Sequence, residues 1–136
     1  LIIMNKIKNQ ALMLHKINSD KYELLLSYVD EVLIGDKTNR EGHAAKVYFN
    51  GLFGNGFVRN SIDNINNALN YGYSIILSTI TKEIINNGYI TQLGIHHKNE
   101  FNEFNLSCDL MEPFRVIIDN FVYYNKNRNN YPHISI

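Results

Sequence analysis

The sequence predicts an all-α protein, a helical bundle. Apolar residues recur at steps of three and four along most of the 136 residues, and strand-like alternation is nearly absent. Hydrophobic residues make up 45% of the chain and aromatic residues 12%, so a packed core is expected and disorder is not. The chain begins with Leu1 in place of an initiator methionine, which predicts a piece of a longer protein.

Three helices are expected in the first half of the chain. Residues 5–16 show the apolar spacing of a first helix. Asp20 is the predicted N-cap of a second helix, which Gly35 ends. Thr38 opens a third helix, and Gly54 follows its end. The predicted core-facing residues are Ile7, Ala11 and Leu14 in the first helix, Leu25, Tyr28, Val29 and Val32 in the second, and Ala45, Tyr48, Phe49 and Leu52 in the third.

Two longer helices are expected in the second half, with a non-helical stretch at about residues 94–103 between them. Ser61 is the predicted N-cap of the first, which runs to about Asn87 and is followed by Gly88. The last helix spans about residues 105–124, and Pro113 should kink it because proline lacks a backbone donor. The predicted core-facing residues are Ile62, Ile65, Leu69, Ile76, Ile80 and Ile84, then Leu106, Leu110, Phe114, Ile117 and Phe121.

Charge and cysteine content narrow the class of protein. Thirteen Lys and Arg residues balance thirteen Asp and Glu residues, so the basic composition of many nucleic-acid binders is missing, which does not exclude a local basic patch. The one cysteine, Cys108, has no internal disulfide partner and favours a reducing compartment. No apolar run reaches the length of a membrane span, so a cytoplasmic protein without membrane contact is expected.

Glu41 is a carboxylate on the apolar side of its predicted helix. Counting 41, 45, 48 and 52 places it on the core-facing stripe. Two interpretations are open. Thr38 and Glu41 fit a capping box, in which Glu41 accepts a hydrogen bond from the Thr38 amide, or Glu41 is a functional carboxylate.

Two further groups of side chains are candidate ligands. His96 and His97 are adjacent in a predicted loop, where histidines are most often solvent-exposed, although neutral imidazole is a common metal ligand. Asp109, Glu112 and Arg115 are spaced three apart on one side of the last helix, which suits a solvated face with a Glu–Arg pair or a site for a hard divalent cation. One histidine and two carboxylates from separate elements are a donor set for Mg²⁺ or Mn²⁺ in phosphoryl-transfer chemistry.

Polar and aromatic side chains share the long helix of the second half. They are Asn66, Asn67, Asn70, Tyr71 and Tyr73. Such residues suit phosphate and base contacts. They equally suit an Asn-rich composition with tyrosines in the core, and that second interpretation is favoured.

Four blocks in order resemble the catalytic domain of the CRISPR spacer-acquisition integrase, the "Cas-one" family, and most closely its type II members. The blocks are residues 40–49 (REGHAAKVYF), 67–73 (NALNYGY), 88–97 with its GY and GIHH, and 109–115 (DLMEPFR). The resemblance marks residues 20–124 as the helical catalytic domain, 1–19 as a connecting arm or helix, and 125–136 as an Asn-rich tail. The family's N-terminal β-rich domain is expected to be absent from this sequence.

The resemblance implies one divalent-metal site. Its ligands and catalytic residues are Glu41, His97 and Glu112, and its ion is Mg²⁺ or Mn²⁺. His97 is chosen over His96 because it is the last residue of the Gly-x-His-His block. Asp109 resembles an auxiliary acidic residue near the metal. The positions that resemble DNA-facing residues are Arg115 as the first choice, then Arg59, Tyr71 and Asn70.

The function that the resemblance implies is that of a metal-dependent DNA endonuclease and integrase of CRISPR spacer acquisition. The 3′-hydroxyl of a short DNA fragment attacks a phosphodiester at the leader–repeat junction, and the metal stabilises the charge on the transferring phosphate. The implied partners are double-stranded DNA (prespacer and CRISPR leader–repeat), a small ferredoxin-like adaptation protein and a second copy in a homodimer. Type II systems add their effector nuclease and an accessory adaptation protein. A bacterial cytoplasmic location is implied.

Two alternatives stay open. In the first, the chain is a non-catalytic fragment of that protein, inactive by itself, that binds DNA or a partner. Glu41→Ala separates this alternative from the enzyme, since it should abolish strand transfer and barely change DNA affinity. In the second, the chain is a plain helical-bundle interaction protein with Glu41 as a cap. That alternative predicts a melting temperature indifferent to Mn²⁺, whereas a ligand of the folded state must raise it.

Overall fold

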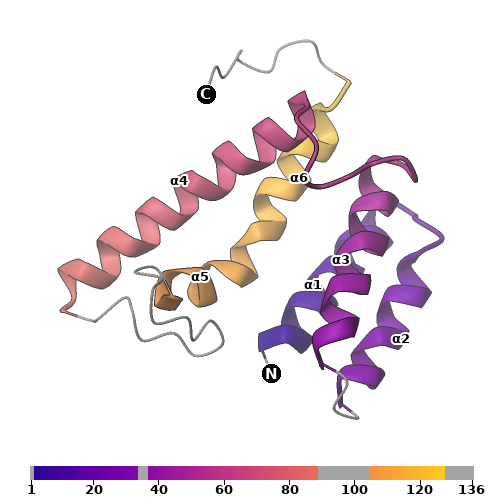
Figure 1. The fold of residues 1–136 in the computed structure, drawn as a ribbon, viewed down its shortest axis with the longest axis horizontal. Coiled ribbons are helices and arrows are strands. Elements are labelled where there is room, and N and C mark those ends of the chain that lie inside the picture. The colour runs from indigo at the N-terminus through magenta and orange to yellow at the C-terminus, as the bar shows by residue number, and fades with distance from the viewer. Residues whose placement is uncertain (1, 34–36, 89–104, 128–136) are drawn as a thin grey trace. The chain divides into compact units, whose positions relative to one another are not determined.

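The computed structural model describes residues 2–33, 37–88 and 105–127 (Figure 1). Within these ranges the structure is all-α, as predicted, and no strand occurs in them. The elements are α1 (Ile2–Lys16), α2 (Tyr22–Leu33), α3 (Lys37–Phe53), α4 (Asn64–Asn86), α5 (Asn105–Met111), the 3₁₀ turn η1 (Glu112–Phe114) and α6 (Arg115–Asn125). None of the described helices combines the length and hydropathy that crossing a lipid bilayer requires.

The chain forms two compact units, Leu1–Ile62 and Asp63–Ile136. The first contains α1, α2 and α3, and the second contains α4, α5, η1 and α6. The domain boundaries predicted after residues 19 and 124 stay predictions.

The first unit is a three-helix bundle in which each helix packs against the other two (Figure 1). Most of the predicted core-facing residues are buried, whereas Tyr28, Ala45 and Phe49 are half-buried and Ala44 lies in the core in place of Ala45. The buried apolar residues are Ile7, Ala11, Met13, Leu14, Leu25, Val29, Val32, Ala44, Tyr48 and Leu52. The α1–α3 contact is close at Gly51, where a Cβ atom would lie 2.7 Å from Leu14 Cδ2. Apolar burial on all three helices therefore stabilises this unit.

Several helix ends in the first unit differ from prediction: α1 begins at Ile2 and not at residue 5, α3 begins at Lys37 and not at Thr38, and the predicted end of α2 at Gly35 lies outside the described residues. The predicted N-cap Asp20 is wrong, because α2 begins at Tyr22 and Asp20 lies exposed in the preceding turn. Ser19 supplies the acceptors there: its Oγ accepts from the Lys21 amide at 3.3 Å and its carbonyl from the Tyr22 amide at 3.4 Å. Gly54, predicted to follow α3, has φ of 101°, a left-handed conformation that favours glycine.

The start of α4 is also corrected. Asp63 is the N-cap, with extended backbone, and its Oδ1 accepts a hydrogen bond from the Asn66 amide at 2.7 Å. The predicted cap Ser61 is wrong, and Ile62, predicted to face the core, precedes the helix and is 95% exposed. At the other end, the predicted positions are confirmed, since Asn87 is the C-cap and Gly88 has φ of 80°.

The corrected cap leads to a stability prediction. Asp63→Ala removes the acceptor for one of the first amides of α4 and should lower the free energy of unfolding by about 1 kcal/mol. Ser61→Ala is the matched control and should change it by less than about 0.5 kcal/mol, because Ser61 is exposed and outside the helix. Chemical denaturation followed by circular dichroism measures both. An equal loss in the two variants would contradict the assignment of the cap.

In the second unit, α5 and α6 pack against α4, and the interruption predicted at Pro113 is present (Figure 1). The 3₁₀ turn Glu112–Phe114 separates α5 from α6, and Pro113 lies in its first turn. The Arg115 amide donates to the Glu112 carbonyl across this turn. Because proline supplies no amide hydrogen, the α-helical hydrogen bonds end here and resume with α6.

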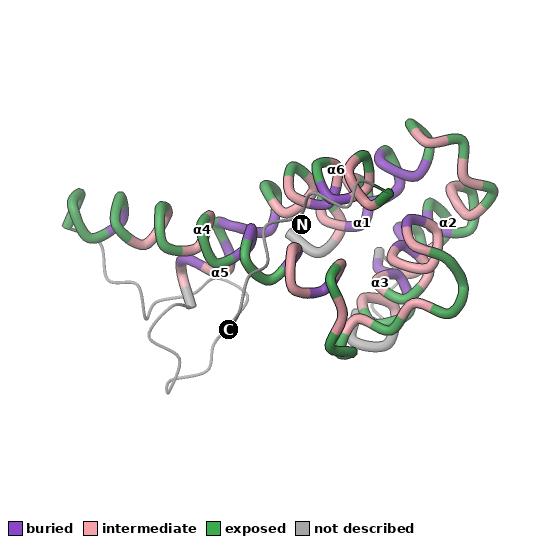
Figure 2. Tube along the Cα trace, turned by 90° about the horizontal axis from the view of Figure 1, so that it is seen from above, coloured by how far each residue is buried: buried purple, intermediate pink, exposed green. Residues whose placement is uncertain are grey.

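The inward face predicted for α5 and α6 is wrong. Leu110, Phe114, Ile117 and Phe121 are exposed, Ile117 by 61%, and only Leu106 is half-buried. The buried residues are instead Ser107, Asp109, Met111, Glu112, Asp119 and Val122. Figure 2 shows buried residues recurring along α4 with exposed ones between them. Ser107 and Asp119 bond to Thr81 and Tyr73 of α4, and Glu112 pairs with Arg115 of α6. These partners offset the cost of burying the polar side chains.

Candidate functional site

Glu41 lies in the first unit on α3 and faces α1. Lys6 of α1 donates a hydrogen bond from Nζ to Glu41 Oε1 at 3.2 Å, and the two side chains are 21% and 29% exposed. The carboxylate is therefore half-buried beside the core, as its place on the apolar stripe predicted. The capping-box interpretation depends on Thr38, whose side chain lies outside the described part of the chain.

Arg59 lies beside an aromatic cluster in the same unit. Its guanidinium carbon is 5.7 Å from the centroid of the Phe49 ring. Phe49, Phe53 and Phe57 contact one another with ring centroids 5.0–6.4 Å apart. The cluster fixes the guanidinium near the end of α3 by a cation–π contact. A role of Arg59 in DNA binding stays a prediction.

Glu112 lies in the second unit, in the 3₁₀ turn, and its side chain is only 6% exposed. Arg115 donates from Nε to Glu112 Oε1 at 3.1 Å, and its guanidinium carbon lies 4.7 Å from the centroid of the Tyr73 ring. Tyr73, on α4, donates its hydroxyl hydrogen to the Asp119 carboxylate on α6. These four residues, named the Tyr73 cluster, connect α4 with η1 and α6.

The sequence predicts part of the Tyr73 cluster. The spacing of Glu112 and Arg115 predicts a pair and Tyr73 is expected in the core, whereas Asp119 is not among the predicted residues. One signal was present in the sequence, because 112, 115 and 119 are separated by three and four residues and so share a helix face. The structure buries the two acids of this face, with Asp119 2% and Glu112 6% exposed, and leaves Arg115 half-buried between them.

Asp109, the predicted auxiliary acidic residue, is buried on α5, one turn before Glu112. Its neighbour Ser107 is fully buried and accepts a hydrogen bond from Thr81 of α4 at 2.8 Å. These contacts hold α5 against α4 and place both carboxylates in a buried, polar part of the unit. The attraction between a carboxylate and a cation is stronger away from water, and it is opposed by the hydration that both groups lose there.

The predicted metal ligands belong to different parts of the chain, and their meeting at one ion stays a prediction. Glu41 belongs to the first unit and Glu112 to the second, and His97 lies outside the described residues. Among the residues that are described, no group of three His, Cys, Asp or Glu side chains is arranged to hold a metal ion. The chemistry of the donor set fits a hard divalent cation, since it consists of two carboxylates and one imidazole.

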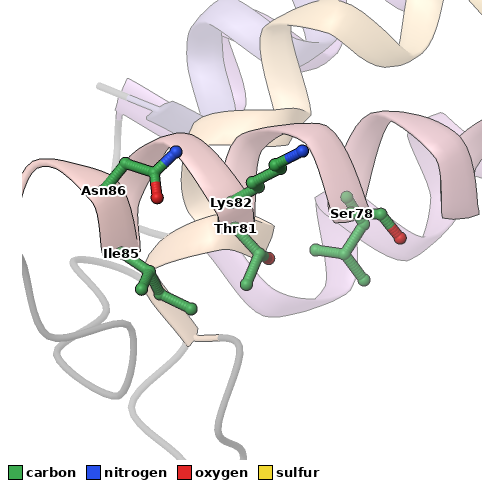
Figure 3. A pocket seen from close by; sticks show the side chains of 6 residues that line it. Ser78, Thr81, Lys82, Ile85 and Asn86 are labelled. Carbon is green, nitrogen blue, oxygen red and sulfur yellow. The ribbon is translucent and has the colours of Figure 1, made fainter.

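Two predicted DNA-facing residues, Asn70 and Tyr71, are exposed on α4. Farther along α4, an open recess of about 400 Å³ is lined by Leu77, Ser78, Thr81, Lys82, Ile85 and Asn86 (Figure 3). It contains none of the predicted site residues. Exposure makes Asn70 and Tyr71 accessible to a large ligand, and DNA binding by them stays a prediction.

Comparison with known proteins identifies similar chains. The family model described as CRISPR associated protein Cas1 matches residues 1–133. The CRISPR-associated endonuclease Cas1 of Neisseria meningitidis serogroup C (strain 8013) is 38% identical over 119 residues, which cover 87% of this chain and 39% of that protein. The CRISPR-associated endonuclease Cas1 1 of Francisella tularensis subsp. novicida (strain U112) is 32% identical over 143 residues, covering 89% of this chain and 45% of that protein. The chain therefore spans less than half the length of these two relatives, and the resemblance based on the four blocks is confirmed.

Proposed function

Because the chain belongs to the Cas1 family, we propose that it carries the metal-binding and catalytic residues of a DNA endonuclease and integrase of CRISPR spacer acquisition. The observation that carries the proposal is the match itself: it runs over residues 1–133, which include all the proposed site residues, and two relatives at 38% and 32% identity are named endonucleases.

Glu41, His97 and Glu112 are the proposed ligands of one Mg²⁺ or Mn²⁺ ion. A bound divalent ion supplies a Lewis acid that polarises a phosphate and stabilises the charge on the leaving oxygen. The chain's own contribution begins with Glu112, whose carboxylate is buried and held by Arg115 before any ion arrives. Asp109, buried one helical turn away, adds negative charge near the same place.

The proposed reaction is a transesterification of DNA. The 3′-hydroxyl of a short DNA fragment attacks a phosphodiester at the leader–repeat junction. A new bond from phosphorus to that oxygen forms while the bond from phosphorus to the 3′-oxygen of the cut strand breaks, and the leaving oxygen takes up the proton that the attacking hydroxyl loses. Arg115 is proposed to contact the transferring phosphate. Its bond to Glu112 uses the Nε hydrogen, one of five N–H donors on the guanidinium, and the terminal donors suit phosphate oxygens.

The proposed partners follow from the same family. They are prespacer and leader–repeat DNA in double-stranded form, a small ferredoxin-like adaptation protein and a second copy of the chain. A type II effector nuclease and an accessory adaptation protein are also proposed, and the proposed location is the bacterial cytoplasm. Arg59, Asn70 and Tyr71 are proposed to contact DNA. Two of these are exposed on α4, and the third lies beside an aromatic cluster, an environment typical of nucleic-acid surfaces.

The test is strand transfer on a branched leader–repeat substrate with Mn²⁺, by the 136-residue chain and by variants that lack one proposed ligand. One observation favours a second candidate function, a non-catalytic fragment that binds DNA or a partner. The chain covers only 39% and 45% of the two relatives, so an activity of the whole protein can depend on regions outside it. DNA binding without strand transfer by the unsubstituted chain would support this second function.

The Lys6–Glu41 ion pair leads to a prediction about metal affinity. The ammonium group of Lys6 competes with a cation for the Glu41 carboxylate, so Lys6→Met should tighten Mn²⁺ binding by up to about fivefold, the scale of a half-exposed ion pair. Lys8→Met is the matched control, because Lys8 is exposed on the same helix. The Mn²⁺-induced rise in melting temperature measures both. Weaker binding in Lys6→Met than in Lys8→Met would contradict Glu41 as a ligand.

A further inference from the structure

The second unit supports Glu112 through side chains that reach back to α4. We propose that Tyr73 is a positioning residue for Glu112: the Tyr73 ring contacts the guanidinium of Arg115, and that guanidinium is hydrogen-bonded to the Glu112 carboxylate. This inference rests on the proposed function, in which Glu112 is a metal ligand. It adds to the proposed site a residue from outside the block 109–115, and it explains why Asp119 is buried.

The first step is the anchoring of Tyr73 by Asp119. The Tyr73 hydroxyl donates to the Asp119 carboxylate, and both side chains are buried. A hydrogen bond to a carboxylate away from water is of the strong, charge-assisted kind. The neighbouring Gly72 brings the backbone of α4 against Ile118 of α6, which leaves little room for the two helices to shift. The Tyr73 ring is therefore held in one place relative to α6.

The second step is the support that the ring gives to Arg115. The guanidinium carbon is 4.7 Å from the ring centroid, well within the range of a cation–π contact. Arg115 is 30% exposed, so without the ring its long side chain would have several rotamers open to it. The ring restricts the guanidinium to the side of α6 where Glu112 lies.

The third step is the orientation of Glu112 by Arg115. The 3.1 Å hydrogen bond from Arg115 Nε binds Oε1 and so fixes the direction of the carboxylate. Glu112 needs this support from a side chain because Pro113 interrupts the α-helical hydrogen bonds next to it. Groups that orient a ligand carboxylate typically change metal affinity by about 10- to 100-fold when removed.

The experiment measures the Mn²⁺ dissociation constant of the 136-residue chain by electron paramagnetic resonance titration. Thermal melts followed by circular dichroism identify a temperature at which every variant is folded, and the titrations are run at that temperature. Tyr73→Leu removes the ring and should weaken Mn²⁺ binding about tenfold or more. Tyr73→Phe keeps the ring and loses only the hydrogen bond to Asp119. Its Mn²⁺ affinity should therefore stay within about threefold of that of the unsubstituted chain. Neither substitution changes the net charge.

Tyr124→Leu is the matched control. Tyr124 is an exposed tyrosine on α6, nine residues after Arg115, and its removal should leave the dissociation constant unchanged. If Tyr73→Leu does not fold, Arg115→Gln replaces it. Loss of a nearby positive charge by itself would tighten cation binding. Weaker binding in Arg115→Gln therefore supports positioning, and unchanged or tighter binding overturns it.

Glu112→Gln in the same titration separates the two proposals. Weaker binding in both Glu112→Gln and Tyr73→Leu supports both. Weaker binding in Glu112→Gln with unchanged binding in Tyr73→Leu overturns the positioning role and leaves the ligand in place. Unchanged binding in Glu112→Gln, or no Mn²⁺ binding by the unsubstituted chain, overturns the assignment of Glu112 as ligand and the positioning role with it.

Discussion

Glu112→Ala is expected to lower the rate of strand transfer by about 100-fold or more. The substitution removes a proposed metal ligand, and a bound metal contributes several kcal/mol of stabilisation to the charge on a transferring phosphate. In the folded chain the Glu112 carboxylate is 6% exposed and hydrogen-bonded to Arg115. The substitution therefore removes a carboxylate that is already oriented, and not a mobile surface side chain. A branched leader–repeat substrate with Mn²⁺ measures the rate.

The control for this experiment is Glu83→Ala. Glu83 is an exposed carboxylate on α4 in the same unit and should leave strand transfer unchanged. DNA affinity, measured in parallel, should change little in Glu112→Ala, because phosphate contacts depend on cationic and amide groups. Full activity in Glu112→Ala would contradict the proposed site. Inactivity of the unsubstituted chain as well would favour the non-catalytic fragment.

Gly72→Val is expected to lower the free energy of unfolding by about 3 kcal/mol. A Cβ atom at Gly72 would lie 2.5 Å from Cγ2 and 2.9 Å from Cδ1 of Ile118, so α4 cannot approach α6 as closely once a side chain is present. Ile118 is β-branched and has few alternative rotamers, which prevents it from moving aside. Overpacking of this kind costs about 1–3 kcal/mol, and valine adds two methyl groups beyond the Cβ.

Gly42→Val tests whether the effect comes from the contact and not from the loss of a helical glycine. Gly42 lies within α3, and a Cβ there meets nothing within 4 Å. Valine has a somewhat higher helix propensity than glycine, so this variant should be as stable as the unsubstituted chain or slightly more so. Ile118→Ala combined with Gly72→Val should recover part of the loss, since the two residues are in contact. Equal destabilisation at Gly42 and Gly72 would contradict the close helix contact. Denaturant unfolding measures all three variants.

The first unit shows how far apolar spacing predicts a core. Ile7, Ala11 and Leu14 are buried as their spacing indicates, and so are Leu25 and Tyr48. Here each helix has one clearly apolar stripe and packs against two others, so the stripe and the buried face coincide.

The second unit shows where apolar spacing fails. The apolar stripe of α6 is exposed, as at Ile117 and Phe121, and the acidic stripe is buried, as at Asp119. Hydropathy along one helix cannot reveal that Tyr73, on α4, bonds to Asp119 and contacts the arginine that pairs with Glu112. The predictions of the helix caps failed for a related reason. Asp20, Ser61 and Asp63 are all residue types that cap helices, and the backbone conformation at each position decides which of them is the cap.

The candidate site, too, is predictable from the sequence only in part. The family, the all-α class, the interruption at Pro113 and the identity of the candidate ligands follow from the sequence, because they depend on local patterns of residues and on their order along the chain. The Glu112–Arg115 pair also follows from its spacing, whereas the partners distant in sequence required the tertiary structure: Lys6 for Glu41, and Tyr73 with Asp119 for Arg115. These contacts join residues as far apart as 46 positions, and which distant side chains meet depends on how the helices pack, which no local pattern specifies.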